Sequence, residues 1–368
     1  MIRLALQSGI GARLLLPGSR KTYLSLRVKC YNRSMNPDVL ARLKNASMLS
    51  EQEVKYDLVS TGSYALNKIV SGKYNGGVPV GAITQFVGAA STAKTVFGTR
   101  ILREAQKKGY YTVIVDTENA YSAEFAKTLG LDPGKLIYAA PPTLEASFKF
   151  IHDSINAIRR DDEDTPIVIF YDSIAVSPSE DEFFREAEDV ATEQDNEKKR
   201  SDNMDGAQRA KKTGALLRRL NPHLRPKKVA LVVVNQFRKD IGGYRPTKTA
   251  AAGGNALEYY LAVNLETAKG DKIGPKHAPT GIKGEVRNLK NKIHVPFREC
   301  DFELMFDEGI NPYHGILPHL EADGVVERGG AWYTVKSTGK KFQSAHLKDL
   351  IESKDEGVKP ITDLLNEE

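Results

Sequence analysis

The chain has 368 residues, of which 40% are hydrophobic and 27% are charged, a composition typical of a globular protein with about two domains. No apolar run approaches the ~20 residues that a membrane-spanning helix needs, and the two cysteines, Cys30 and Cys300, are too few for a disulfide framework. The composition excludes both classes and favours a reducing compartment, which we expect to be the cytoplasm.

The net charge of +6 comes from the first 34 residues. Residues 1–34 contain seven basic side chains and no acidic one, which leaves 46 basic and 47 acidic residues in the rest of the chain. An Arg-rich segment without acids is typical of organelle targeting peptides. Alternatively, the natural start is Met35, and this basic leader is a flexible arm or a start-site artefact. The overall charge therefore predicts nothing about partners of the remaining chain.

From about residue 82, short β-branched runs alternate with longer helical patterns, the order expected of βαβ units around a mostly parallel sheet. The sequence therefore predicts an α/β fold. The expected strands are 82–88, 111–118, 135–141, 166–175 and 229–236, with a later one at 284–297. The expected helices between them are 94–108, 123–129 and 144–160.

Three later stretches depart from this alternation. Residues 180–205 hold eleven acidic and four basic side chains, and we expect a solvated loop there. Residues 206–239 hold ten basic side chains and no acidic one, which predicts a local basic stripe. The run at 240–257, rich in Gly and Ala, is typical of a long loop. From about residue 311, a small helical pattern leads to an acidic end of the chain.

The segment GAASTAKT at 88–95 follows an expected strand and opens an expected helix, the context of the phosphate-binding loop G-x-x-x-x-G-K-[ST]. Backbone N–H groups of such a turn bind anions, helped by the positive end of the helix. Lys94 would then neutralise phosphates, and Thr95 would offer its hydroxyl to Mg²⁺. Ala93 replaces the second glycine, and alanine fits there if its φ is negative. Taken alone, the octapeptide also fits an accidental helix start.

Polar side chains end three of the expected strands, at the sheet edge where nucleotides bind. Asp172 follows the apolar run IVIFY, and a carboxylate there can hold Mg²⁺. Glu118 ends VIVDTE, where it can deprotonate an attacking water. Asn235 and Gln236 end VALVVVNQ, where an amide can hydrogen-bond a γ-phosphate and report its loss. Each residue alone also fits a solvated strand end, whereas together they favour a nucleotide site.

Several motifs follow one another in a fixed order: DLVSTGSYALNKIV, GAASTAKT, VIVDTENAY, YDSIAVSP, VVVNQFRKDIGG, AAGGNALEYY, LKNKIHVPF and FDEGINPYHGIL. With this order, about residues 38–335 resemble the RecA family of homologous-recombination ATPases, and the variant phosphate loop is more similar to its phage UvsX-type branch. The resemblance implies a RecA-type P-loop ATPase core at 58–311. It also implies an oligomerisation segment at 35–57 and a small C-terminal α/β domain at 312–368.

The resemblance assigns roles to individual positions. It implies nucleotide contacts from the residues of the phosphate turn, namely Gly88, Ser91, Thr92, Ala93, Lys94, Thr95 and Val96. Glu118 is implied to be the catalytic glutamate, Asp172 the Walker-B acid that holds Mg²⁺ together with Thr95, and Gln236 the nucleotide sensor. Phe125 stands where the family stacks an aromatic ring on adenine, although a core position in its own helix fits it equally well.

Two features imply that neighbouring copies of the chain cooperate. Lys290 and Lys292 match paired lysines that reach the ATP of the adjacent subunit, although without the resemblance an exposed strand of alternating charges is the simpler interpretation. Residues 38–48 resemble the helix that packs on the next subunit of a filament. Glu258 stands where the family has a lysine, so the resemblance does not carry that one contact to this chain.

For DNA, the resemblance implies contacts from two regions. Lys211 and Arg218 are seven residues apart, on one face of an expected helix, and match phosphate-contacting positions. The matches in the second DNA-binding loop are Arg238, Gly253, Gly254 and Asn255, where a flexible linker is the alternative. The acidic stretch 180–205 stands at the first DNA-binding loop, and its charge disfavours direct contact with phosphate.

We therefore expect an ATP- and Mg²⁺-dependent recombinase that forms helical filaments on single-stranded DNA and exchanges strands with homologous duplex DNA. A loader and a single-strand-binding protein are the further partners implied. One alternative is a ring-shaped, helicase-like ATPase of the same core, against which the LKNKI and GGN motifs argue. The other is a DNA-binding accessory protein without hydrolysis, against which Glu118 argues.

Overall fold

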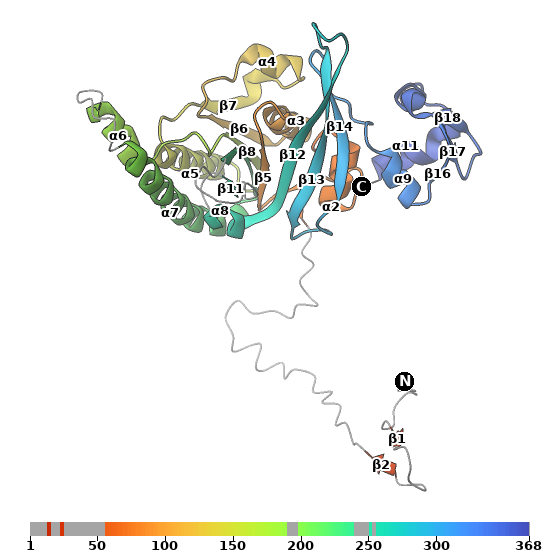
Figure 1. Cartoon of the computed structure of the whole chain (residues 1–368), viewed down its shortest axis with the longest axis horizontal. Coiled ribbons are helices and arrows are strands. Elements are labelled where there is room, and N and C mark those ends of the chain that lie inside the picture. The colour runs from red at the N-terminus through yellow and green to blue at the C-terminus, as the bar shows by residue number, and fades with distance from the viewer. Residues whose placement is uncertain are drawn as a thin grey trace. The chain divides into compact units, whose positions relative to one another are not determined.

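The structure is a computed structural model of the chain (Figure 1) and describes residues 13–15, 23–25, 56–189, 198–238, 250–251 and 255–367. The chain divides into two units, residues 1–55 and residues 56–368. In the first unit, β1 (Arg13–Leu15) pairs antiparallel with β2 (Tyr23–Ser25). The helix expected at 38–48 lies outside the described residues, as does Cys30.

The second unit contains a mixed sheet that has nine strands among the described residues. In chain order they are β5 (Ile83–Gly88), β6 (Tyr111–Asp116), β7 (Leu136–Ala139), β8 (Ile167–Asp172), β9 (Val229–Asn235), β12 (Leu261–Ile273), β13 (Gly281–Asn291), β14 (Glu299–Met305) and β15 (Gly309–Ile310). Their spatial order is β15-β14-β13-β12-β5-β9-β8-β6-β7, with parallel pairing from β12 to β7 and antiparallel pairing from β12 to β15. The predicted α/β fold with a mostly parallel central sheet is confirmed.

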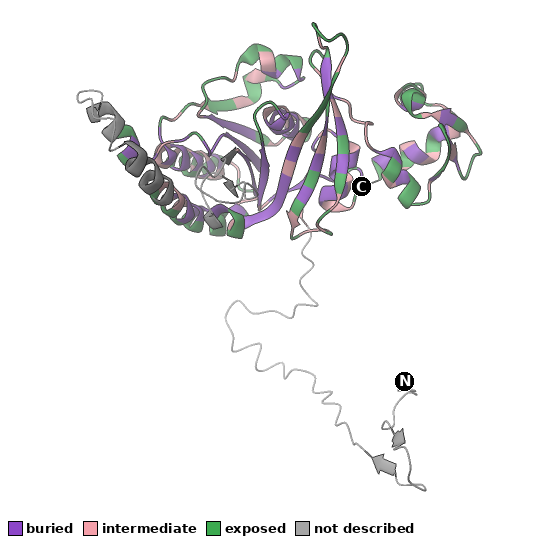
Figure 2. Ribbon diagram, viewed as in Figure 1, coloured by how far each residue is buried: buried purple, intermediate pink, exposed green. Residues whose placement is uncertain are grey.

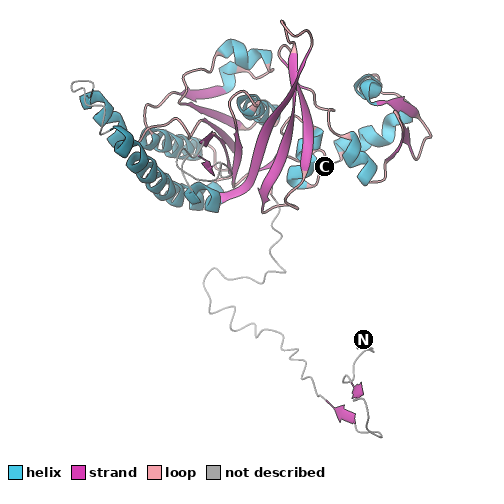
Figure 3. Cartoon of the chain, viewed as in Figure 1, coloured by secondary structure: helices cyan, strands magenta, loops and turns pink. Residues whose placement is uncertain are grey.

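Helices cover both faces of the sheet (Figures 2 and 3). The side chains of its parallel strands alternate between two apolar clusters, one on each face. Phe170 joins the apolar cluster that contains α3, whereas its neighbour Tyr171 joins the cluster that contains α5 and α7. A Cβ atom at Gly98 of α3 would lie 2.2 Å from the Phe170 ring, so α3 packs directly on β8. These helices are α2 (Tyr64–Ser71), α3 (Lys94–Lys107), α4 (Ala123–Thr128), α5 (Leu144–Asp161) and α7 (Lys198–Leu224).

The expectation of a loop at 180–205 is wrong for the part that the structure describes. Residues Glu180–Asp189 form α6, and α7 begins at Lys198. A capping box explains the start of α6, because the Ser179 N–H donates to Glu182 Oε2 (2.6 Å) and the Glu182 N–H donates to Ser179 Oγ (3.4 Å). Acidic side chains in the first turn also favour the positive end of a helix. The S-x-x-E motif formed by Ser179 and Glu182 therefore indicates a helix, whereas the number of charged residues alone indicated a loop.

The strand expected at 284–297 is also partly wrong, because β13 ends at Asn291. The Asn291 side chain accepts hydrogen bonds from the backbone N–H groups of Ile293 and His294, both at 2.9 Å. Its own amide donates to the carbonyl of Val70 at 2.7 Å. This local turn takes the backbone out of the sheet, as asparagine side chains commonly do.

Residues 312–367 form a small α/β unit, whose apolar cluster includes Leu320, Val335 and Phe342 together with Tyr74 from the segment after α2. Its elements are α9 (Leu317–Ala322), β16 (Val326–Gly329), β17 (Trp332–Val335), β18 (Lys341–Gln343), α10 (Leu347–Glu352) and α11 (Lys359–Asn366). The remaining short elements are β3 (Leu58–Val59), β4 (Val78–Pro79), β10 (Phe237–Arg238), β11 (Ala250–Ala251) and α8 (Asn255–Tyr260). In the described part of the chain, no helix has the length and apolar character required to cross a membrane.

Candidate functional site

The turn between β5 and α3 lies at the carboxyl edge of the parallel strands. Gly88 ends β5, and a Cβ atom there would lie 2.3 Å from the carbonyl oxygen of Thr267 on β12. The hydroxyls of Thr92 and Thr267 are 2.7 Å apart, and Thr92 Oγ1 also donates to the carbonyl of Ala89 at 2.9 Å. The turn is therefore fixed against β12, and only glycine fits at position 88 without displacing that strand.

Ala93, which stands at the second glycine position of the phosphate-loop pattern, adopts a left-handed backbone conformation. Its φ is +67° and that of Ser91 is +59°, so both lie in the left-handed region, and the condition of a negative φ at Ala93 is not met. A left-handed conformation costs a residue with a Cβ atom about 1–2 kcal/mol relative to glycine. The contact between the hydroxyls of Thr92 and Thr267 and the close approach of Gly88 to β12 hold the turn in this shape.

Lys94 is the cation at the start of α3. Its side chain is buried, and its Nζ donates to the carbonyls of Gly88 (3.1 Å) and Ala89 (2.5 Å). Burial lowers the pKa of Lys94, while the carboxylates of Asp172 and Glu118 oppose that shift. The ammonium group is thus held beside the turn, within the electrostatic influence of two acids.

Asp172 ends β8 and contacts the first turn of α3. The Thr95 hydroxyl donates to Asp172 Oδ2 at 2.6 Å. The Asp172 side chain is only 6% exposed, and this burial is the main reason that its pKa is raised to about 6. The hydrogen bond from Thr95 and the charge of Lys94 lower this pKa, whereas Glu118 raises it. A hydroxyl and a carboxylate in contact provide two of the hard oxygen ligands that Mg²⁺ prefers.

Glu118 lies two residues beyond the end of β6 and is exposed. Its Oε1 accepts hydrogen bonds from the hydroxyl of Ser173, at 3.1 Å, and from the side-chain amide of Gln236, at 3.5 Å. The backbone N–H of Gln236 donates to Asn235 Oδ1 at 2.9 Å. The ends of β6, β8 and β9 are therefore connected through one carboxylate that solvent can reach.

Beneath this site, buried amides connect three strands of the sheet. Asn235 Nδ2 donates to Gln85 Oε1 at 3.0 Å, and Gln85 Nε2 donates to Asn264 Oδ1 at 2.9 Å. Sequence reasoning identified Asn235 but not its two partners. Their signal was weak, because each is a single amide without a motif around it.

One cavity of about 580 Å³ brings most of the predicted site together. Its lining includes residues 90–96 of the turn together with Glu118, Asp172 and Gln236. Two lining residues that sequence reasoning missed are Lys269 of β12 and Phe306, whose side chain is 53% exposed. The volume suits a small polar molecule with a few converging polar groups. No cluster of three or more His, Cys, Asp or Glu side chains forms a metal site within the described ranges.

Phe125 is not among the residues that line this cavity. It lies half-buried on α4, with its ring edge-to-face against Tyr121 at a centroid distance of 5.6 Å. The Tyr121 hydroxyl donates to Thr99 Oγ1 of α3 at 3.2 Å. Burial raises the pKa of Tyr121 to about 12. The aromatic pair therefore lies beside the middle of α3, and adenine stacking on Phe125 stays a prediction.

Lys290 and Lys292 do not line the cavity of their own chain. Lys290 pairs with Asn264 in the first half of β12, and the N–H of Lys292 donates to the Ala262 carbonyl at 2.8 Å, still nearer the start of that strand. Their ammonium groups donate to the carbonyls of Glu258 and Tyr259 on α8, which precedes β12 (Figure 1). Because β12 runs parallel to β5, these lysines lie toward the opposite edge of the sheet from the phosphate turn.

Of the predicted DNA-contacting residues, Lys211 and Arg218 are both exposed on α7. Leu217 and Leu220 face the core on the other side of this helix. Lys212 is held by carboxylates instead, with its Nζ 2.9 Å from Glu145 and 2.6 Å from Asp181.

The predicted residues of the second DNA-binding loop are described only in part. Arg238 ends β10 and Asn255 begins α8, whereas Gly253 and Gly254 lie outside the described residues.

Comparisons with known proteins agree with this architecture. The model of the RecA N-terminal domain family matches residues 41–311. Protein RecA of Wolbachia sp. subsp. Drosophila simulans is 31% identical over 315 residues, which cover 84% of this chain and 82% of that protein. Protein RecA of Ureaplasma parvum serovar 3 is 29% identical over 282 residues, covering 77% and 78%.

A third relative, Protein RecA of a Synechococcus species, is 27% identical over 346 residues, which cover 91% of this chain and 83% of that protein. The similarity to the phage UvsX-type branch stays a prediction. The matched range includes the phosphate turn and the ends of β6, β8 and β9 that form the cavity. The chain therefore belongs to the RecA family of recombination and repair ATPases.

Proposed function

We propose that the protein is an ATP-dependent recombinase that assembles as a helical filament on single-stranded DNA and catalyses homologous pairing and strand exchange. The observation that carries the proposal is that the phosphate turn, Asp172, Glu118 and Gln236 line one cavity in a chain of the RecA family. A phosphate-binding turn, a metal-binding acid, a base and a reporting amide are the parts that phosphoryl transfer to water needs.

The residues at the cavity fit ATP and Mg²⁺. Thr95 and Asp172 present two oxygen atoms 2.6 Å apart, which suits a cation that usually takes one or two protein ligands and completes its shell with phosphate and water. When bound, Mg²⁺ neutralises charge that develops on the transferring phosphoryl group. Lys94 and the N–H groups at the start of α3 bind the phosphates.

Glu118 acts as the general base. Its carboxylate accepts the proton of the attacking water at Oε1 or Oε2, while Ser173 and Gln236 orient it through their hydrogen bonds to Oε1. Glu118 Oε1 also connects hydrolysis to the DNA-binding region through its hydrogen bond with Gln236. Gln236 directly precedes β10 and the proposed second DNA-binding loop, which leads to α8. A change in the hydrogen bond of Gln236 therefore alters the start of the second DNA-binding loop.

Lys290 and Lys292 complete the site of a neighbouring copy. Their position toward the other edge of the sheet supports a contact between subunits, because in a head-to-tail filament opposite sides of adjacent copies meet. Burial lowers the pKa of Lys290, and the charge of Lys292 adds to this shift. Two adjacent cations brought to the phosphates would stabilise charge in the transition state as an arginine finger does.

DNA binds through its backbone. Lys211 and Arg218 are exposed on one face of α7, and together with Arg238, Gly253, Gly254 and Asn255 they form the proposed path of the strand. Contacts to phosphate carry little sequence information, and they release counterions. Binding is therefore expected to be tolerant of sequence and to weaken strongly with salt.

Electron microscopy of the full chain with ATP, Mg²⁺ and a long single strand tests this function, together with a strand-exchange assay on homologous duplex DNA. We expect open helical filaments and exchanged product, and loss of both in Lys94→Ala. Closed rings would instead support the helicase-like alternative. Filaments that exchange no strand and hydrolyse no ATP would support the accessory-protein alternative.

A further inference from the structure

A second cavity, of about 700 Å³, lies on the flank of α3 away from the phosphate turn. It is bordered by the loop at residues 60–64, by one face of α3, by the ends of β14 and β15, and by α10 of the C-terminal unit. It shares no lining residue with the cavity that contains Lys94. The proposed function therefore does not account for it.

Arg100 lines this cavity and is the least expected residue in it. Its side chain is only 8% exposed, and it has no hydrogen bond or ion pair with any residue that the structure describes. Burial lowers the pKa of Arg100, the positive charge of Arg103 adds to the shift, and the charge of Glu104 opposes it without an ion-pair contact. A buried guanidinium without an anionic partner is costly, so buried charges in proteins are normally paired.

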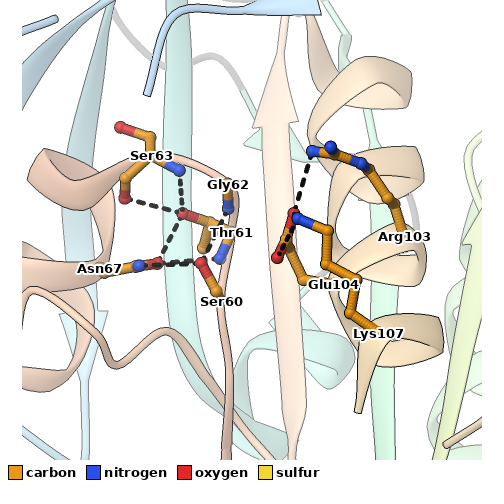
Figure 4. Close-up of polar contacts among 8 residues, drawn as sticks. All are labelled: Ser60, Thr61, Gly62, Ser63, Asn67, Arg103, Glu104 and Lys107. Carbon is orange, nitrogen blue, oxygen red and sulfur yellow. Dashed lines mark hydrogen bonds and ion pairs between the residues drawn. The ribbon is translucent and has the colours of Figure 1, made fainter. Parts of the chain in front are cut away.

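The same face of α3 carries further cations. Arg100, Arg103 and Lys107 follow one another at helical spacing, and they turn toward one side of the helix. Glu104 accepts from both Arg103 (3.1 Å) and Lys107 (2.9 Å), so one carboxylate is shared between two cations (Figure 4). The three cations together with Glu104 carry a net charge of +2.

The wall opposite α3 is a rigid turn. Asn67 Oδ1 accepts from both the N–H and the hydroxyl of Thr61 at 2.8 Å, and its amide donates to Ser60 Oγ at 3.0 Å (Figure 4). Gly62 has a φ of +78°, and a Cβ atom there would lie 2.8 Å from Arg100 Nε. Glycine thus lets the guanidinium lie against the backbone of this turn.

We propose that Arg100, supported by Arg103 and Lys107, binds a phosphate group in this cavity. A phosphate monoester or free phosphate is close to dianionic at neutral pH, which matches the net charge of this face of α3. Its oxygen atoms accept the planar fork of donors that a guanidinium presents. The far wall is acidic, with Glu303, Glu308 and Glu352 against Lys348, so the anion is expected at the α3 end.

Thermal unfolding and calorimetric titration of the full chain with inorganic phosphate test the proposal, with sulfate-free chloride buffer as the reference. We expect phosphate to raise the Tm of the unaltered chain and of Lys94→Ala, in which the phosphate turn is impaired. Arg100→Gln should weaken phosphate binding at least about tenfold, because it removes charge-assisted hydrogen bonds. The matched control is Arg160→Gln, an exposed arginine of α5 outside both cavities, which should bind phosphate as the unaltered chain does.

Two further measurements make the result decisive. In chloride buffer, Arg100→Gln should have a higher Tm than the unaltered chain, because the unpaired buried charge is gone. Lys107→Gln, at the more exposed end of the same face, should weaken phosphate binding less than Arg100→Gln and serves if Arg100→Gln does not fold. Phosphate binding that persists in both variants and disappears in Lys94→Ala would overturn the proposal, because the anion would then bind only at the phosphate turn.

The Lys94→Ala variant, in which the phosphate turn is impaired, is used to distinguish a nucleotide phosphate from free phosphate as the ligand. Inorganic phosphate and adenosine monophosphate are titrated separately. If adenosine monophosphate binds more tightly than inorganic phosphate, and the double variant Lys94→Ala with Arg100→Gln loses this binding, the cavity is a nucleotide site. Equal or tighter binding of inorganic phosphate would identify a site for the free anion. No binding of either compound would contradict the proposal.

Discussion

The hydroxyl of Thr95 lies 2.6 Å from Asp172 Oδ2 and joins the first turn of α3 to the end of β8. These two side chains come from positions 77 residues apart, and each supplies an oxygen atom of the kind that Mg²⁺ prefers. Their contact is the structural basis for assigning the metal to this corner of the cavity.

Thr95→Val should therefore impair Mg²⁺-dependent ATP binding while leaving the fold intact, because valine has nearly the shape of threonine but no hydroxyl. We expect an apparent Mg²⁺ affinity at least about tenfold lower, measured by titrating the metal at fixed ATP. Thr95→Ser is the matched control and should retain most of the affinity. Equal affinity in all three proteins would contradict the assignment of Thr95.

Glu118→Gln should abolish most ATP turnover while preserving nucleotide binding. The amide keeps the size of the side chain and can still accept from Ser173, but it cannot take a proton from water. General-base catalysis typically contributes about 10²–10⁴-fold, so we expect a decrease of at least about 10²-fold in single-turnover hydrolysis. Ser173→Ala, which removes only an orienting hydrogen bond, should have a much smaller effect. Normal turnover by Glu118→Gln would mean that another group is the base.

Ala93→Gly should stabilise the protein, because Ala93 is the N-cap of α3 rather than a residue inside the helix. Because Ala93 has a φ of +67°, glycine relieves backbone strain there. After allowance for the extra freedom of glycine in the unfolded chain, we expect a gain of about 1 kcal/mol in the free energy of unfolding. Chemical denaturation measures it. Ala89→Gly is the control in the same turn, because the φ of Ala89 is not positive, and it should give no gain.

The elements around the phosphate turn could be predicted from sequence to within about two residues. The strand expected at 82–88 is Ile83–Gly88, and the helix expected at 94–108 is Lys94–Lys107. Continuous apolar runs are typical of strands that are covered on both faces. The turn itself then fixes where the strand ends and the helix begins, so the sequence alone places Lys94 and Thr95 in the first turn of the helix.

Other features depend on tertiary contacts that no local pattern reveals. β12 is mostly buried in its first half but exposed from Lys269 to Lys272, so its sequence lacks both a continuous apolar run and a regular alternation. For this reason Lys269 was missed as a residue of the cavity. The left-handed conformation of Ala93 depends on the packing of the turn against β12, and the burial of Arg100 depends on how residues 60–63 fold back on α3.

A mixing experiment tests whether Lys290 and Lys292 act on the neighbouring site. Lys290→Ala with Lys292→Ala should hydrolyse little ATP alone, as should Glu118→Gln. In an equal mixture, a site formed by Glu118 of one chain and the two lysines of the next should arise at about a quarter of the junctions. We expect ATP turnover to recover toward that fraction of normal. No recovery in mixed filaments would show that the lysines do not act across the junction.

Whether neighbouring copies form the active site is tested by the rate of ATP hydrolysis of the full chain, measured with and without single-stranded DNA over a range of protein concentrations at low salt. If neighbouring copies complete the cavity on DNA, the rate per chain should rise at least about tenfold with DNA and increase cooperatively with concentration. A rate per chain that is unaffected by DNA and independent of concentration would contradict an active site shared between neighbouring copies.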